Sequence, residues 1–253
     1  MGLIHVSHGP VCLGKGPRKH SAKALPFSNY AKVSSIAYPA VHAWERKIDW
    51  GMLGNNKVGN CTIAAMLHLI MGWQEVANAG TPVSFTEQEA IDLYSAITGY
   101  NPNDPNTDQG ANETDVLNYW KSTGALGHKI AGYVSLDISN IEMVKAAIYL
   151  FGGVYIGFSV PEYIMEIPNG GSWSQKPGAD VNIEGGHAIY LPGYGRDGAT
   201  GVSWGTTYTF NWDFWHTYVD EAYAIVSTDW IEQSGKSPSG VDMNGLIADL
   251  SQV

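Results

Sequence analysis

The sequence lacks the features by which several large classes of protein are recognised. It has two cysteines in 253 residues, which excludes a disulfide-rich secreted scaffold and leaves a Cys12–Cys61 bridge as the one possible pairing. It has no long apolar run, and its first residues lack the apolar segment of a signal peptide. No glycine motif of a nucleotide site is present either. We therefore expect no cofactor, no membrane partner and no export by a signal peptide, which leaves the cytoplasm of the producing cell or a virion as the location.

Positive charge is scarce in most of the chain and concentrated at its start. Residues 1–47 contain seven Lys and Arg against the single acid Glu45, a net charge of +6, whereas the rest of the chain combines seven Lys and Arg with 23 Asp and Glu, a net charge of −16. We interpret residues 1–47 as a basic N-terminal arm and residues 48–253 as one acidic domain. The arm is expected to lie on acidic surface without covering Cys61, or to contact a partner protein or an assembly. Nucleic acid is not expected, because no aromatic residues are interleaved with the basic ones.

Helices are predicted in the first half of the domain. Apolar residues recur at helical spacing from Cys61 until Gly80, and a capping box starts a second helix at Thr86. Further helices are predicted over residues 115–121 and 139–151.

Strands are predicted in the second half. A β-branched and aromatic stretch at 153–160 reads as a buried strand, and short strands separated by glycine-rich turns follow from Gly185, among them the aromatic run 208–215. This order predicts an α+β fold with two lobes, a helical half at 48–135 and an antiparallel β-rich half at 136–253. A short helix is expected in the acidic tail.

Cys61 is the candidate nucleophile because it stands at the predicted start of a helix. Unpaired N–H groups and the helix dipole stabilise a thiolate there, and Asn60 is placed to cap the helix. His187 follows 126 residues later, flanked by glycines and an apolar strand. A cysteine with a distant downstream histidine is the order of a Cys-His dyad. Each residue taken alone also fits an ordinary core position.

Several segments in the same order resemble papain-like cysteine peptidases over most of residues 48–210. They are Asp49-Trp50, the loop amide Asn55, Gly59-Asn60-Cys61-Thr62, DVLNYWKSTGAL, VKAAIYLFGGVYIGFSVP, GGHAIYLPGYG and VSWG. The resemblance implies the two-lobed papain-like fold, with uncharacterised bacterial and phage proteins as the expected relatives.

The resemblance also implies roles for further residues, with two departures from the family pattern. Asn55 stands where the family has a glutamine that stabilises the oxyanion, with Asn56 as a second choice. Val202 stands where the family has the asparagine that orients the histidine, so we assign that role to Asn211, with Asp213 or a backbone carbonyl as alternatives. Thr62 and Trp204 are expected to support the site, Trp204 by shielding it from water.

These patterns predict a cysteine peptidase that cleaves peptide or amide bonds through Cys61 and His187. The alternative is a weak or inactive papain-like scaffold with a structural or binding role, for instance in a phage particle. Asp104, Asn106 and Asp108 have the spacing of calcium ligands, but the positions of Pro105 and of the glycines do not fit a calcium loop, and we expect no metal.

Overall fold

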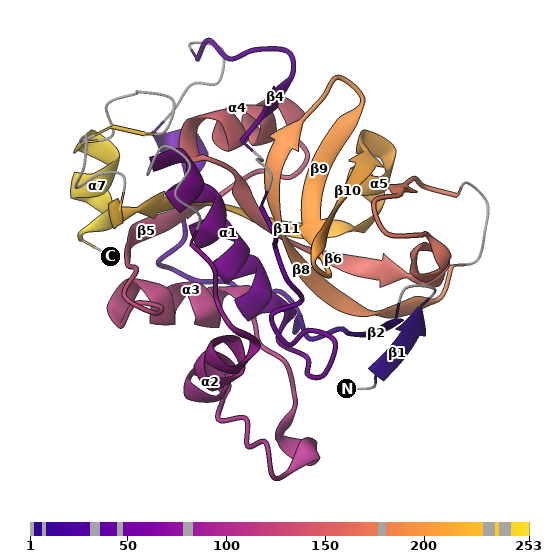
Figure 1. Cartoon of the computed structure of the whole chain (residues 1–253). Helices are drawn as coiled ribbons and strands as arrows, with labels where there is room; N and C mark the ends of the chain where they lie inside the picture. Colours follow the sequence, from indigo (N-terminus) through magenta and orange to yellow (C-terminus); the bar gives the residue numbers. More distant parts are fainter. Residues whose placement is uncertain are drawn as a thin grey trace.

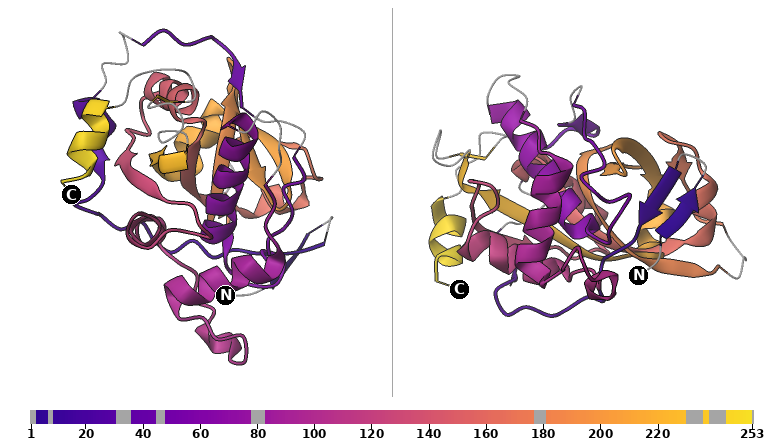
Figure 2. Two further views of the ribbon diagram at one scale, coloured as in Figure 1. Left: turned by 60° about the vertical axis from the view of Figure 1, so that its left-hand side comes forward. Right: turned by 60° about the horizontal axis from the view of Figure 1, so that its bottom comes forward.

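The computed structural model describes residues 3–6, 9–30, 36–44, 48–77, 83–176, 181–229, 236–237 and 244–252. Helices and strands are combined in an α+β fold, with α1 lying across one face of a large twisted sheet (Figures 1 and 2). Among these residues, no helix is both long enough and apolar enough to cross a membrane.

The four predicted helices are confirmed, three in the helical half and the fourth at the start of the β-rich half. Glu89 and Thr86 form the expected capping box at the start of α2, and Gly99 ends that helix with a left-handed backbone, φ 78°. Gly80, the expected end of the first helix, lies outside the described residues. The longer helices are α1 Cys61–Ala77, α2 Glu87–Thr98, α3 Glu113–Ser122 and α4 Ile141–Phe151. Short 3-10 helices span Phe27–Asn29, Pro105–Thr107 and Glu162–Glu166.

One sheet holds most of the strands, in the spatial order β3-β5-β11-β6-β8-β9-β10-β7, with β4 paired to β8. Most pairs are antiparallel, as expected, but β3 with β5 and β10 with β7 are parallel. A separate two-stranded hairpin is formed by β1 and β2. The strands are β1 Leu3–Val6, β2 Gly9–Cys12, β3 Leu25–Pro26, β4 His42–Ala43, β5 Ile130–Ser135, β6 Val154–Pro161, β7 Ser172–Trp173, β8 Ile183–Tyr194, β9 Gly198–Ser203, β10 Thr206–Asn211 and β11 Val219–Ser227.

Residues 212–218 are helical, so the prediction of a continuous strand through the aromatic run was wrong. The side chain of Asn211 accepts a hydrogen bond from the N–H of Phe214 at 2.8 Å, which caps helix α5 (Trp212–Tyr218) and ends β10. The large aromatic side chains of this region still pack into the core, as expected. The short helix predicted in the tail is confirmed as α7, Asn244–Leu250.

The arm contributes to the sheet and to the core. β3 and β4 both come from residues 1–47, and the side chains of Val11, Leu13 and Phe27 are buried. The boundary at residue 47 therefore separates regions of different charge that pack as one structure.

Candidate active site

Cys61 is the first residue of α1, as predicted, and its side chain is only 1% exposed. The loop before it is held in place by Asp108, whose carboxylate accepts hydrogen bonds from the Gly59 N–H at 3.0 and 3.2 Å. Burial raises the pKa of the Cys61 thiol to about 11, while hydrogen bonds with the backbone of Ala188 and Gly14 act in the opposite direction. The helix start was expected to favour a thiolate, but desolvation outweighs it in this buried environment.

His187 lies on β8, directly before Ala188, so α1 and β8 bring the predicted nucleophile and histidine to the same part of the molecule. The imidazole is 1% exposed and stacks on Trp204, with ring centroids 4.7 Å apart. Trp204 therefore covers the ring, in keeping with the shielding expected of it. Burial, followed by the nearby His68, lowers the pKa of His187 to about 3, so the imidazole is neutral at pH 7.

Ser203 is the hydrogen-bonding partner of His187, and the sequence analysis missed it. The Oγ of Ser203 lies 2.8 Å from Nε2 of His187, and among the described residues Nδ1 of the same ring has no partner. If Ser203 accepts the proton on Nε2, the lone pair on Nδ1 is left available as a base. The sequence did contain a signal for this role, because Ser203 is the residue next to Val202 in the VSWG segment.

The expected role of Asn211 as the partner of His187 was wrong, because the side chain of Asn211 caps α5 instead. Val202 is buried at 1% exposure and precedes Ser203 on β9, so its side chain projects from the opposite face of the strand. An asparagine at position 202 would therefore not reach the imidazole as Ser203 does.

The predicted site residues Asn55 and Asn60 are both buried. Asn55 donates from Nδ2 to the carbonyl of Cys12 at 3.0 Å and to that of Val58 at 3.3 Å. Asn60 donates to the carbonyl of Leu53 at 2.8 Å, and its Oδ1 has no partner among the described residues, so the expected side-chain cap of α1 is not formed.

Thr62 lies in the first turn of α1, where its carbonyl accepts a hydrogen bond from the Tyr155 hydroxyl at 2.9 Å. This bond ties the start of the helix to β6. Thr62 thus supports the position of Cys61 through its backbone.

Residues 12–16, here called the strap, cover Cys61. Gly14 contacts the thiol, and the N–H of Lys15 donates to the carbonyl of Gly186 at 3.0 Å, one residue before His187. On the other side, Ala111 donates to the Gly14 carbonyl and accepts from the Gly16 N–H, each at 2.8 Å. The strap is thus held from both sides by backbone hydrogen bonds, like an added strand.

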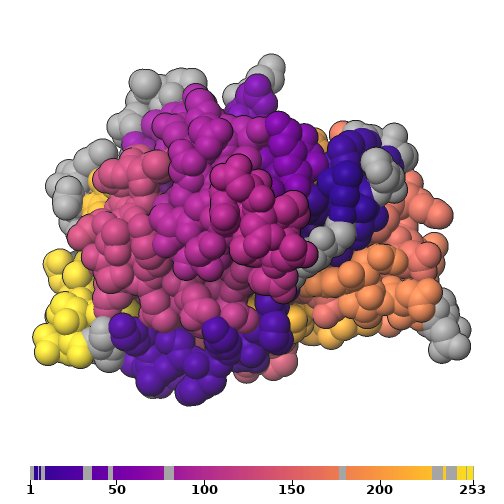
Figure 3. Space-filling model, turned by 90° about the horizontal axis from the view of Figure 1, so that it is seen from below, coloured from indigo at the N-terminus to yellow at the C-terminus, as the bar shows by residue number. Residues whose placement is uncertain are grey.

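The strap fits so closely that it has no room for a side chain at Gly14. A Cβ there would lie 1.7 Å from the carbonyl oxygen of Gly59. A Cβ at Gly186 would lie 2.4 Å from the carbonyl oxygen of Lys15. Figure 3 shows N-terminal residues, in indigo, lodged between the magenta helical residues and the orange residues of the strands.

The expectation that the arm leaves Cys61 uncovered was therefore wrong, although the arm does bind acidic residues. Lys19 pairs with Asp115 at 2.6 Å, and Lys15 pairs with Asp220 and Glu221. Complementary charge holds the arm down, and glycines in the strap allow it to approach the start of α1 more closely than a charge argument predicts.

Cys12 has surroundings similar to those of Cys61. It is buried in the strap, and desolvation raises its pKa to about 11, as for Cys61. Both cysteines are free thiols, so the bridge that the sequence allows is not formed.

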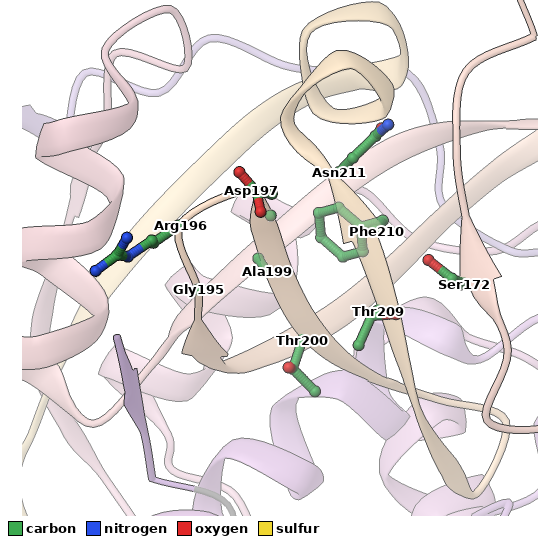
Figure 4. Close-up of a pocket in the computed structure, with 10 residues that line it drawn as sticks. Ser172, Gly195, Arg196, Asp197, Ala199, Thr200, Thr209, Phe210 and Asn211 are labelled. Atoms are coloured by element: carbon green, nitrogen blue, oxygen red, sulfur yellow. The ribbon is translucent and has the colours of Figure 1, made fainter. Parts of the chain in front are cut away.

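A pocket of about 350 Å³ lies away from this site, between the β8–β9 turn and β10 (Figure 4). Neither Cys61 nor His187 lines it. Its lining residues are Ser172, Gly195, Arg196, Asp197, Gly198, Ala199, Thr200, Thr209, Phe210 and Asn211.

The loop with calcium-like spacing has a structural role. Asp108 accepts hydrogen bonds from the Tyr94 hydroxyl and the Gly59 N–H, and Asp104 caps the short helix that starts at Pro105. In the described parts of the chain, no group of three or more His, Cys, Asp or Glu could hold a metal ion.

The fold is that of papain-like cysteine proteases. The chain is similar to xylellain, a cysteine protease from Xylella fastidiosa, with a TM-score of 0.67 and 14% identity over 85% of this chain and 96% of that one. It is similar to procathepsin B S9 from Trypanosoma congolense, with a TM-score of 0.60 and 11% identity over 85% of this chain and 86% of that one. For the cysteine protease CMS1MS2 from Carica candamarcensis, the TM-score is 0.54 with 16% identity over 75% of this chain and 99% of that one. No family model and no curated protein matches the sequence.

Proposed function

We propose that this chain is a papain-like cysteine peptidase, with Cys61 as nucleophile and His187 as general base and acid, and that the structure represents its latent form. The observation that carries the proposal is the position of the Cys61 thiol, which starts α1 and contacts the backbone of Ala188, next to an imidazole whose Nε2 is held by Ser203. The papain-like fold of the structural neighbours supports it.

The proposed reaction is acyl transfer to water. The Cys61 thiol gives its proton to His187, and the sulfur attacks a peptide carbonyl. His187 then protonates the leaving amine, and water releases the acyl group from the sulfur. Asn55 is the proposed side-chain donor to the oxyanion, because its Nδ2 already donates to a carbonyl of the strap, that of Cys12.

In the latent form neither partner is charged at pH 7. Burial keeps the proton on Cys61, with a pKa of about 11, and keeps it off His187, with a pKa of about 3. Removing the strap admits water, and the effect of burial on both pKa values then falls. A thiolate and an imidazolium become the stable pair beside the start of the helix.

The test is to displace the strap without truncating the chain. The methyl group of Gly14→Ala would lie 1.7 Å from the carbonyl oxygen of Gly59. The strap can therefore no longer bind in its present position. We expect labelling of Cys61 by iodoacetamide, mapped by mass spectrometry at pH 6, to be at least about tenfold faster than in the unchanged chain, since exposure restores thiolate character. Hydrolysis of a denatured protein substrate should appear with it.

Gly245→Ala is the matched control, because a Cβ at Gly245 meets no atom within 4 Å. It should leave both readouts at the level of the unchanged chain, and Cys61→Ser should abolish hydrolysis in the Gly14→Ala chain. Rapid labelling without hydrolysis of any substrate would reject the peptidase and favour a papain-like scaffold that binds peptides. Slow labelling in a folded Gly14→Ala chain would reject the latent form.

A further inference from the structure

The Lys15 side chain fills a socket in the body of the protein. Its ammonium lies 2.8 Å from Oε1 of Glu221 and 3.0 Å from Oδ1 of Asp220, and it donates to the Gly16 carbonyl at 3.2 Å. The Lys15 side chain is 1% exposed and that of Glu221 is 2% exposed. The Tyr223 hydroxyl donates to the other oxygen of Glu221 at 2.8 Å and fixes that carboxylate. The ammonium is therefore bound by two carboxylates of β11, of which that of Asp220 is partly exposed and that of Glu221 is buried and held by Tyr223.

Gly157 on β6 provides the room for this side chain. A Cβ at Gly157 would lie 1.9 Å from Cε of Lys15 and 2.7 Å from Oε1 of Glu113. The socket is thus a shaped space between β6, β11 and the start of α3.

Glu113 adds a second buried carboxyl group to the socket. It is completely buried, and within the described residues neither of its carboxylate oxygens has a hydrogen-bonding partner. Burial, followed by the charge of Glu221, raises its pKa well above the usual range. An arginine carries five N–H donors in a fork, against three on a lysine, and could reach acceptors that Lys15 leaves unused.

The socket also lies close to the thiol. Gly14, the neighbour of Lys15 in the strap, contacts Cys61, and Lys15 itself donates to Gly186 beside His187. A peptide that replaces the strap would place one side chain in the socket while its backbone passes the thiol.

We infer that this socket is the specificity subsite for a basic side chain, so that the substrates are peptides with Lys or Arg within about two residues of the bond that is cleaved. The inference rests on the proposed function for its role in cleavage. The strap itself occupies the subsite with Lys15 and thereby excludes such substrates.

The first experiment maps the cleavage sites of the Gly14→Ala chain in a denatured protein mixture by mass spectrometry. Lys and Arg should be enriched at one position near the cut. Matched peptides with Lys, Arg or norleucine at that position then give kcat/KM. We expect the basic peptides to exceed norleucine by about 10- to 100-fold, the range of a lost hydrogen bond to a charged group.

Variants of the socket separate binding from folding. Glu221→Gln keeps an oxygen for Tyr223 but removes the charge, and should lower kcat/KM for the basic peptides by about tenfold or more while sparing norleucine. Gly157→Ala should act in the same direction, by filling the socket. Glu142→Gln, an exposed carboxylate on α4, is the control and should change neither value. Equal losses for basic and neutral peptides in the socket variants would overturn the inference.

A binding experiment keeps the inference testable if no hydrolysis occurs. A labelled peptide of residues 10–20 is titrated into a chain carrying Gly14→Ala, Lys15→Met and Cys61→Ser. In this chain the strap has no lysine that could compete with the peptide for the socket. The labelled peptide should bind at least about tenfold more tightly than the same peptide with methionine at position 15. Equal affinities would overturn the subsite, whereas selective binding without hydrolysis would overturn only the peptidase.

Discussion

Among the described residues, His187 is held by its stack on Trp204 and by a hydrogen bond to the hydroxyl of Ser203. The bond between Nε2 and Ser203 Oγ leaves Nδ1 as the nitrogen that can exchange a proton with the thiol. Without that bond the ring samples tautomers that present the wrong nitrogen. Ser203 is therefore proposed as a positioning residue that acts through His187.

Replacing Ser203 tests this role in the Gly14→Ala chain. Ser203→Ala should lower kcat by about 10- to 100-fold, a part of the roughly 100- to 10,000-fold that a positioned acid or base contributes, with little change in KM. Ser203→Thr keeps the hydroxyl and should retain most of the activity. The pH profile of kcat should shift in the alanine variant and not in the threonine variant. An unchanged kcat with a raised KM would show that Ser203 serves substrate binding instead.

At the scale of the element, local sequence signals decide where helices begin. Thr86 and Glu89 exchange hydrogen bonds across the first turn of α2, with the Glu89 N–H bonded to Thr86 Oγ1 at 3.2 Å and the Thr86 N–H bonded to Glu89 Oε2 at 2.7 Å. These bonds need no distant partner, which is why the sequence alone revealed them.

Thr86→Ala should therefore lower the free energy of unfolding by about 1 kcal/mol, the usual value of an N-cap. Urea unfolding followed by circular dichroism measures it. Thr123→Ala, at the exposed C-terminal end of α3, is the matched control and should change the free energy of unfolding by less than about 0.5 kcal/mol. A loss as large in the control would show that the effect belongs to threonine removal in general.

At the scale of the whole molecule, buried histidines should make the fold sensitive to acid. Burial lowers the pKa of His187 to about 3 and that of His68 to about 4, both below the ordinary value of 6.5. Below pH 6.5 these two histidines bind protons in the unfolded chain, whereas they stay unprotonated in the folded chain until the pH is much lower. Stability should therefore be unaffected by these two groups above pH 6.5 and should fall as the pH drops from 6.5 towards 4, by up to about 1.4 kcal/mol per pH unit for each histidine.

Urea unfolding at pH 7, 6, 5 and 4.5 measures this decline. His68→Gln should make the curve less steep, whereas His216→Gln, on the exposed side of α5, should leave its slope unchanged. A slope that does not respond to His68→Gln would show that other groups cause the acid sensitivity.

The sequence by itself determined the α+β order, the helix that begins at Cys61, the strand that carries His187, and most of the papain-like pattern. These features follow from apolar periodicity, capping residues and glycines, which act over a few neighbouring residues. It also located the candidate dyad, because the order of cysteine and histidine along the chain is visible without coordinates.

Only the tertiary structure decided the state of the site. It brought Ser203 rather than Asn211 to the imidazole, laid the strap over Cys61, and enclosed Lys15 among Glu113, Asp220 and Glu221. Hydrogen bonds and ion pairs between residues far apart in sequence fix each of these arrangements, so a local pattern can supply a candidate such as Ser203 but does not show which residue it contacts. The raised pKa of the thiol and the lowered pKa of the imidazole arise in the same way, because desolvation depends on every segment that packs over a group.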